Sequence, residues 1–351
     1  MISPALIDRL GSASALATTV NQQYLRQLCQ KAEAEGLSVG GLLRQAGLTE
    51  MALDRPVALG ALCRVIDALQ ASLPRDDLAL EVALGTPPGA HGPLVLLLTS
   101  APTLRLGLLD LIRFYLLRTR ALQLTLEDQR TSGVLAVRPA LALGQHELFL
   151  LEWALANLLG LLAAAKGAAM SSCAFELPRP KVGRAWIAAA KSWGMPAPTP
   201  GSGAIVQLPA GLLDQAQATA NTMEYRHALR TCNDLLRQQE EARQHVARLS
   251  TLLVKGGADH EFRQGELARR LGLSTAAMRR HLRVEGLSFD ELVEFSRRRQ
   301  AWALLRESSL PIAEVAGKLG YRDASNFSRS CRRWFGMTPG DLRRAAADSK
   351  Q

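Results

Sequence analysis

The chain has 351 residues, more than a single hydrophobic core usually organises, so at least two domains are expected. Hydrophobic residues make up 48% and charged residues 21%, which excludes a largely disordered chain and favours a soluble, mostly helical protein. The net charge is +10, and residues from Lys255 onward contribute +7 of it, with 19 basic against 12 acidic side chains. This concentration of positive charge favours a polyanionic partner such as nucleic acid.

The cysteines and the apolar segments indicate a cytoplasmic protein. The five cysteines are scattered without a C-x-x-C pair, so neither a zinc site nor a disulfide framework is predicted, and no metal or cofactor is expected. The first twenty residues lack the basic start and apolar core of a secretory signal. The apolar run 148–165 contains Glu152 and Asn157 and is short for a bilayer crossing, which predicts a buried helix and no membrane partner.

An α+β domain is predicted over residues 25–213, after an N-terminal extension over residues 1–24. Segments 25–34 and 60–72 carry apolar residues at helical spacing between glycines and prolines, which predicts several short helices. In 123–139, apolar residues alternate with polar ones on both sides of a glycine. This alternation predicts a β-hairpin.

Two more strands are predicted over 173–177 and 204–208, with a helix at about 185–193 between them. Residues 214–257 contain many good helix formers and almost no glycine or proline, which predicts a helical linker and a possible dimer contact. A glycine-rich turn then ends this helix. The last domain is predicted over residues 258–347.

The last domain opens with a helix-turn-helix pattern. A short amphipathic helix over 266–271 ends at Gly272, and Ser274 can cap the next helix. That helix places Met278 and Leu282 inward at i, i+4 spacing. The residues left on or near its outer face are Ala276, Arg279, Arg280 and Arg283. Such a face can enter the major groove of double-stranded DNA, where arginine pairs with guanine.

The same pattern recurs over residues 312–321. A second recognition helix follows, for which Asp323 is the predicted N-cap, with Phe327 and Cys331 facing inward. The small or polar residues on its outer side are Ala324, Ser325, Asn326, Ser328 and Arg329. One long helix over 289–306 is predicted to hold the two patterns at fixed spacing, so that they read successive major grooves.

Three short motifs close the second pattern in a fixed order. They are Gly320-Tyr321, Ser325-Asn326-Phe327-Ser328-Arg329 and Phe335-Gly336-Met337-Thr338-Pro339, preceded by Leu305, Pro311-Ile312 and Val315-Ala316. With these motifs the last domain resembles the AraC/XylS family of transcriptional regulators. Cys331 is a departure, since the family usually has phenylalanine there, and looser packing is expected around it.

The resemblance implies an all-α domain with two helix-turn-helix motifs joined by a long helix. It implies base contacts from Ala276, Arg279 and Arg280 in one recognition helix. In the other it implies base contacts from Ala324, Ser325 and Arg329, with Asn326 near the phosphates. The alanines offer at most an apolar contact to a thymine methyl, so the arginines are expected to carry specificity. A phosphate contact or a solvated charge is an equally weighted alternative for each arginine.

The first domain carries Leu43-x-x-Ala46-Gly47-Leu48 and Ser100-Ala101-Pro102-Thr103-Leu104, followed by a helix through Phe114-Tyr115. In these residues it resembles the ornithine-responsive branch of the family, rather than the cupin-like arabinose pocket. The resemblance implies a small-molecule effector and a homodimer, with RNA polymerase as a further partner and activation favoured over repression. A regulator that takes its signal from a protein partner remains the alternative.

The effector-binding residues are left unassigned. His91 stands in a loop of glycine and proline, and a surface histidine is favoured over a ligand contact there. Trp153, Trp186 and Trp193 are interpreted as core residues rather than a pocket wall.

An enzyme is the class of function that the sequence disfavours. The chain has no G-x-x-x-x-G-K-[ST] phosphate loop, H-E-x-x-H zinc pair or G-x-S-x-G elbow. The pairs Asp76-Asp77 and His146-Glu147 are isolated and are interpreted as solvated or structural. The sequence therefore predicts a regulator rather than a catalyst.

Overall fold

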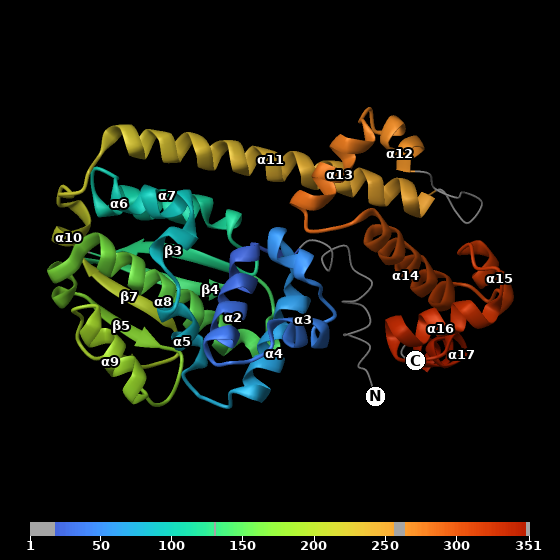
Figure 1. Cartoon of the computed structure of the whole chain (residues 1–351), viewed down its shortest axis with the longest axis horizontal. Coiled ribbons are helices and arrows are strands. Elements are labelled where there is room, and N and C mark those ends of the chain that lie inside the picture. Colours follow the sequence, from blue (N-terminus) through green and yellow to red (C-terminus); the bar gives the residue numbers. More distant parts are fainter. Residues whose placement is uncertain (1–17, 130, 256–263, 349–351) are drawn as a thin grey trace. The chain divides into compact units, whose positions relative to one another are not determined.

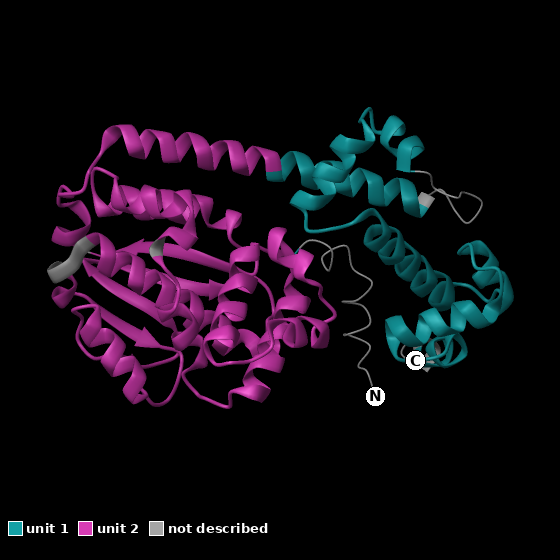
Figure 2. Cartoon of the chain, in the orientation of Figure 1, with its two compact units in different colours: residues 1–18, 239–351 teal, residues 19–238 magenta. Residues whose placement is uncertain are grey.

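The structure is a computed structural model and describes residues 18–129, 131–255 and 264–348 (Figure 1). The chain divides into two compact units, which Figure 2 colours separately. Unit 2 comprises residues 19–238, and unit 1 contains the described residues from Gln239 onward. Unit 2 mixes helices with β-sheet and unit 1 is helical, so the predicted combination of an α+β domain and an all-α domain is confirmed.

Unit 2 contains a five-stranded sheet with the strand order β3-β4-β7-β5-β6. Its strands are β3 (Leu122–Asp128), β4 (Ser132–Pro139), β5 (Ala174–Leu177), β6 (Thr199–Pro200) and β7 (Ala204–Pro209). All neighbours are antiparallel except the β5 and β6 pair. The predicted hairpin is β3 with β4, and the two further predicted strands are β5 and β7.

The helices of unit 2 are α2 (Gln22–Ala34), α3 (Val39–Gln45), α4 (Leu59–Ser72), α5 (Leu78–Leu84), α6 (Pro93–Thr99), α7 (Leu104–Phe114), α8 (Glu147–Lys166), α9 (Arg184–Ser192) and α10 (Ala210–Asp214). Of these, α7, α8 and α10 pack against strands of this sheet, whereas α2, α3 and α4 pack mainly on one another. Short 3₁₀ turns include η3 (Pro88–His91) and η4 (Tyr115–Leu117). The apolar helix α8 packs against β4, β7, α5 and α6. It is apolar and long enough to cross a membrane, but 67% of its apolar window is buried, as expected for a core helix.

The start of unit 2 differs from the expected extension over residues 1–24. Strand β1 (Thr19–Val20) pairs with β2 (Val57–Ala58), and α2 begins at Gln22. Val20 and Tyr24 are buried in the core of unit 2, which is why the chain joins the fold here and not at residue 25. The rest of that extension lies outside the described residues.

The predicted linker over 214–257 is one helix for most of its length. Helix α10 ends at Asp214, and seven residues separate it from helix α11 (Thr222–Lys255). The intervening segment is tied down, because the Gln217 side chain donates hydrogen bonds to the carbonyls of Leu98 and Ala101. The Asn221 side chain then accepts the first free amides of α11.

The boundary between the units falls inside α11, at Gln239, and not at the glycine-rich turn after it. Val246, Leu249 and Leu253 of α11 are buried in the same small core as the first helix-turn-helix pattern. Residues 239–255 of the helix therefore belong to unit 1. A continuous helix gives no break in sequence at which this division could be recognised.

Unit 1 contains α12 (Gln264–Arg270), α13 (Thr275–Val284), α14 (Phe289–Glu307), α15 (Ile312–Lys318), α16 (Ala324–Phe335) and α17 (Pro339–Asp348). It has two separate cores. Helix α14 contributes Phe289 and Leu292 to the first and Ala301 and Leu305 to the second. The prediction of one long helix that joins both helix-turn-helix patterns is confirmed.

Candidate nucleic-acid interface and ligand pocket

The first recognition helix, α13, is fixed at its start by the turn that precedes it. Gly272 has a φ of +69°, a left-handed conformation that suits glycine, and ends the α12 segment. The Ser274 hydroxyl accepts a hydrogen bond from the Ala277 amide at 3.1 Å. Met278 and Leu282 are fully buried, as predicted. The opposite face of α13 is thereby turned to solvent.

The four residues predicted on that face are all exposed: Ala276, Arg279, Arg280 and Arg283. The Arg279 guanidinium donates to the Gln264 side-chain carbonyl from Nε at 3.0 Å and from Nη2 at 2.7 Å. Arg280 and Arg283 form no ion pair with any residue in the described part of the chain. Their guanidinium groups therefore keep all of their donors available to an external anion or base.

The second recognition helix, α16, begins at Asp323, the predicted N-cap. One carboxylate oxygen of Asp323 accepts from the Asn326 amide at 2.7 Å, and the other accepts from the Asn326 side chain at 2.6 Å. Asn326 in turn accepts a hydrogen bond from Arg329 Nη2 at 2.5 Å. Ser325 and Arg329 are exposed, while Ala324 and Asn326 are half-buried. This chain of hydrogen bonds orients the Arg329 guanidinium.

The C-terminal part of helix α16 is hydrogen-bonded to α14. Glu294 accepts hydrogen bonds from the Trp334 indole at 2.8 Å and from Arg333 at 2.6 Å. These bonds, with that from Trp334 the larger cause, lower the pKa of the Glu294 carboxyl. Cys331, where the family pattern has phenylalanine, is fully buried in the second core, to which Val315, Phe327 and Phe335 also belong. The anchoring sets the orientation of α16 on the long helix.

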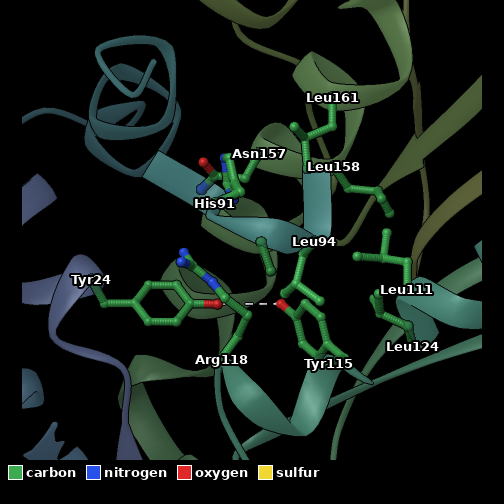
Figure 3. A pocket seen from close by; sticks show the side chains of 11 residues that line it. Tyr24, His91, Leu94, Leu111, Tyr115, Arg118, Leu124, Asn157, Leu158 and Leu161 are labelled. Carbon is green, nitrogen blue, oxygen red and sulfur yellow. Dashed lines mark hydrogen bonds between the residues drawn. The ribbon is translucent and has the colours of Figure 1, made fainter. Parts of the chain in front are cut away.

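Unit 2 contains two adjoining hollows. The first has a volume of about 410 Å³, its open mouth included, and lies where α2, η3, η4, β3 and α8 meet. The second, of about 450 Å³, shares His91, Asn157 and Leu161 with it. In Figure 3 the leucines of the first hollow gather on one side, opposite Tyr24.

Arg118 is the charged residue of the first hollow. It follows η4 directly and is 5% exposed. Its guanidinium lies 4.7 Å from the centre of the Tyr24 ring and donates one hydrogen bond, at 3.3 Å, to the carbonyl of Ala90. No carboxylate of the described residues pairs with it. A buried cation is thus held by an aromatic ring and one neutral acceptor.

The other polar groups of the pocket are neutral. Burial, and secondarily the charge of Arg118, lowers the pKa of His91 to about 4. Burial raises the pKa of Tyr115 well above its usual value, and its hydroxyl lies 3.3 Å from that of Tyr24. The side-chain oxygen of Asn157 is buried without a hydrogen-bond partner, while its amide donates to the carbonyl of Trp153 at 2.8 Å.

The interpretation of His91 as a surface residue is wrong. The side chain is only 9% exposed, because η3 turns it between α8 and η4, and it lines both hollows. Sequence reasoning left Tyr24, Tyr115, Arg118 and Asn157 without a pocket role. The one signal in the sequence is that Arg118 and Asn157 are polar residues at the end of, or inside, strongly apolar runs.

Trp153 and Trp186 are core residues, as predicted, whereas Trp193 is buried and also lines the second hollow. The pairs Asp76-Asp77 and His146-Glu147 each contain a residue with a structural partner. Asp77 pairs with Arg179, which also binds the buried Glu152, and His146 bonds to Asp67. Over the described ranges, no group of three metal-binding side chains comes together.

Comparison with known proteins gives a match for each unit. Residues 36–197 match the family described as the arabinose-binding domain of AraC transcription regulators, and residues 267–345 match a helix-turn-helix domain family. The chain is 26% identical to the ornithine utilization regulator of Pseudomonas aeruginosa over 339 residues, which cover 94% of this chain and 97% of that protein.

Two further similarities concern the C-terminal part and a solved structure. The chain is 42% identical over 77 residues to the HTH-type transcriptional regulator VirS of Mycobacterium tuberculosis, which is 22% of this chain and 23% of VirS. The crystal structure of the transcriptional regulator CdpR from Pseudomonas aeruginosa aligns with 92% of this chain and 98% of that chain, at 20% identity and a TM-score of 0.42.

These matches and the two capped helix-turn-helix units agree with each other. The helix-turn-helix match spans both cores of unit 1, and the arabinose-binding match lies within unit 2. The relatives are transcriptional regulators and not enzymes. The chain therefore carries the two domains of AraC-type transcriptional regulators, an arabinose-binding-type domain followed by an AraC-family helix-turn-helix domain.

Proposed function

We propose that this DNA-binding regulator reads its operator with the exposed faces of α13 and α16 and is controlled by a small-molecule effector held in unit 2. The observation that carries the proposal is the pair of solvent-facing arginine surfaces, each set on its own small core and joined by α14. Two such faces on one rigid helix suit two successive major grooves. The hollows of unit 2 supply a place for the effector.

The proposed DNA-binding residues differ in their expected roles. Arg280 and Arg329 are proposed to read base edges, and Arg279 and Arg283 to contact bases or phosphates beside them. Ala276, Ala324 and Ser325 are small enough to let the helices approach the bases closely. Asn326 is proposed to act near the phosphates and to orient Arg329, to which it is hydrogen-bonded.

The proposal includes a cytoplasmic homodimer that activates transcription through RNA polymerase. Large apolar side chains on the surface of unit 2 support a contact with a second copy, among them Leu109 at 49% exposure and Met223 at 80%. Leu109 lies on α7 and Met223 at the start of α11, so the contact would involve both helices. We propose that residues 19–238 form the effector and dimer domain and that DNA binding belongs to residues 239–347.

A footprint tests this function directly. The purified chain is incubated with the intergenic DNA next to its own gene at physiological salt, with random DNA as competitor. The expected result is a protected tract of about two helical turns for each subunit. Protection that random DNA removes completely, with and without metabolites, would contradict sequence-specific binding.

The second candidate is a regulator controlled by a protein partner rather than a metabolite. The exposed apolar residues of α7 and α11 suit such a partner as well as a second copy. The two candidates differ in a purified system, because only effector control changes the footprint when small molecules alone are added. Ornithine belongs in that screen, since the similar Pseudomonas aeruginosa protein is named for ornithine utilization.

A further inference from the structure

The pocket of unit 2 has one charge and no acidic group. The residues that line the two hollows include Arg118, His91, Asn157 and two tyrosines, and none of the lining residues is aspartate or glutamate. His91 is neutral at pH 7, because burial lowers its pKa to about 4. The net charge of the lining is therefore that of Arg118 alone. An ammonium group placed here would meet a cation and no counter-charge.

Arg118 is poorly compensated for a buried charge. A guanidinium has five N–H donors, and Arg118 uses one of them on a neutral carbonyl. Leaving a buried cation without a counter-ion is strongly unfavourable, and the contact with the Tyr24 ring offsets only part of that cost. A carboxylate matches the planar fork of the guanidinium and accepts two parallel hydrogen bonds. The site thus favours an anionic ligand group.

The remainder of the first hollow is aliphatic. Leu94, Leu111, Leu124, Leu158 and Leu161 line it together with Ala154. A hydrocarbon chain gains free energy by leaving water for such a surface. Asn157 provides one buried acceptor without a partner, which can bind a hydroxyl or N–H group carried by the ligand.

From this arrangement we infer that unit 2 binds an aliphatic monocarboxylic acid, whose carboxylate pairs with Arg118 and whose hydrocarbon chain lies along the leucines. This inference rests on the proposed function, because it names the class of effector that the pocket takes. The carboxylate supplies the counter-charge that Arg118 lacks among the described residues. The uncharged side chains of His91 and the two tyrosines then act as hydrogen-bond partners beside the ion pair.

The first test uses the full-length chain and three probes of equal chain length: hexanoate, hexanamide and hexylamine. Their binding is measured by calorimetry and by the thermal shift at pH 7.4, with acetate, butanoate and octanoate to vary chain length. Hexanoate is expected to bind at least about tenfold more tightly than hexanamide, from the extra strength of charge-assisted hydrogen bonds. Hexylamine is expected not to bind.

Two variants and one control locate the site. Arg118→Met is expected to weaken hexanoate binding at least about tenfold and to abolish the preference for hexanoate over hexanamide. Arg118→Lys keeps the charge and should retain part of that preference. Arg120→Met, two residues along and outside the pocket lining, removes the same charge and should bind hexanoate like the wild type. The comparison of the three probes is made on the wild type, so it tests the inference even if Arg118→Met fails to fold.

The outcomes separate this inference from the proposed function. Equal binding of hexanoate and hexanamide, tighter binding of hexylamine, an unchanged Arg118→Met variant, or no saturable binding of any carboxylate would each overturn the assignment. If another compound changes the footprint while no carboxylate binds, ligand control stands and the ligand class is wrong. If hexanoate binds through Arg118 but operator DNA is never protected, the pocket assignment stands and the proposed function fails.

Discussion

Arg280 and Arg329 are exposed on two different recognition helices, but they are held in different ways. Arg280 has no partner in the described part of the chain, whereas Arg329 is hydrogen-bonded to Asn326, which the N-cap Asp323 holds in turn. A free arginine loses side-chain entropy when it binds a base, while a tethered one has already lost part of it. Their contributions to operator binding should therefore differ in how far they depend on neighbouring residues.

Replacing Arg280 with alanine should weaken operator binding by about 1–3 kcal/mol if the guanidinium reads a guanine edge. Binding to random DNA should fall much less. The measurement is a pair of titrations at one salt concentration, on operator and on random DNA. Arg226→Ala removes an equal charge from an exposed position of unit 2 and is the control. Equal losses on both DNAs would make Arg280 a phosphate contact.

His91 predicts a pH dependence of folding stability. Its pKa is about 4 in the folded chain and about 6.5 when unfolded, so the unfolded state binds the proton more readily. The stabilisation is therefore complete above pH 6.5 and is lost as the pH falls toward 4. The difference in pKa corresponds to up to about 3 kcal/mol.

Urea unfolding of the wild type and of His91→Gln between pH 7.5 and pH 4 measures this effect. The free energy of unfolding of the wild type should fall by up to about 3 kcal/mol relative to that of the variant over this range. Only the wild type has an imidazole that binds a proton more readily in the unfolded state than in the folded state. Other titrating groups act in both proteins and cancel in the difference. Parallel pH profiles would show that His91 is protonated equally in both states.

At the scale of the element, caps decide where the recognition helices begin. Ser274, Ser288 and Asp323 each accept an amide of the following first turn, and Ser288 forms a full capping box with Glu291. These side chains are visible in the sequence, which explains why the starts of α13, α14 and α16 are predicted within a residue. The seven-residue break before α11 depends on tertiary hydrogen bonds from Gln217, for which the sequence has no local signal.

The Asp323 cap can be tested by substitution. Asp323→Ala should destabilise unit 1 by about 1 kcal/mol, since two hydrogen bonds at the start of α16 are lost. It should also weaken operator binding, because Asn326 and Arg329 lose their anchor. Asp323→Asn, which keeps a cap acceptor, is the matched control and should retain most of the stability. Urea unfolding and operator titration of both variants measure the two effects.

At the scale of the whole molecule, the position of the unit boundary has a consequence for function. The C-terminal turns of α11 supply Val246, Leu249 and Leu253 to the first core of unit 1, and Gln300 of α14 donates hydrogen bonds to the carbonyls of Leu253 and Val254. The imidazole rings of His245 and His281, whose centres lie 4.6 Å apart with their planes tilted by 30°, join α11 to the recognition helix α13. Helix α11 thus forms part of the unit that carries α13.

A truncation series tests this arrangement. A fragment that begins at residue 239 should fold cooperatively and bind operator DNA, whereas one that begins at residue 258 loses three buried aliphatic side chains. Their burial is worth about 1.5–3 kcal/mol each, together comparable with the stability of a small domain. In the full chain, Leu249→Ala should cost about 2–5 kcal/mol. Thermal melts and operator titrations of both fragments measure these effects. Equal melting temperatures for the two fragments would contradict a unit boundary at Gln239.

The sequence by itself determined the helix-turn-helix units, the hairpin and the buried helix α8. Their information is local, because apolar periodicity, capping side chains and glycines with positive φ act within a few residues. The outward faces of α13 and α16 follow from the same periodicity. For that reason Ala276, Arg279, Arg280 and Arg283 are exposed, as the pattern alone predicts.

Only the tertiary structure decided the pocket and the division of α11. Tyr24, His91, Arg118 and Asn157 come from four segments spread over more than 130 residues, and nothing local indicates that they meet. The burial of His91 depends on how η3 packs on α8, which is a long-range contact. The boundary inside α11 depends on which core covers each turn of a continuous helix, so it is set by packing and not by a break in the chain.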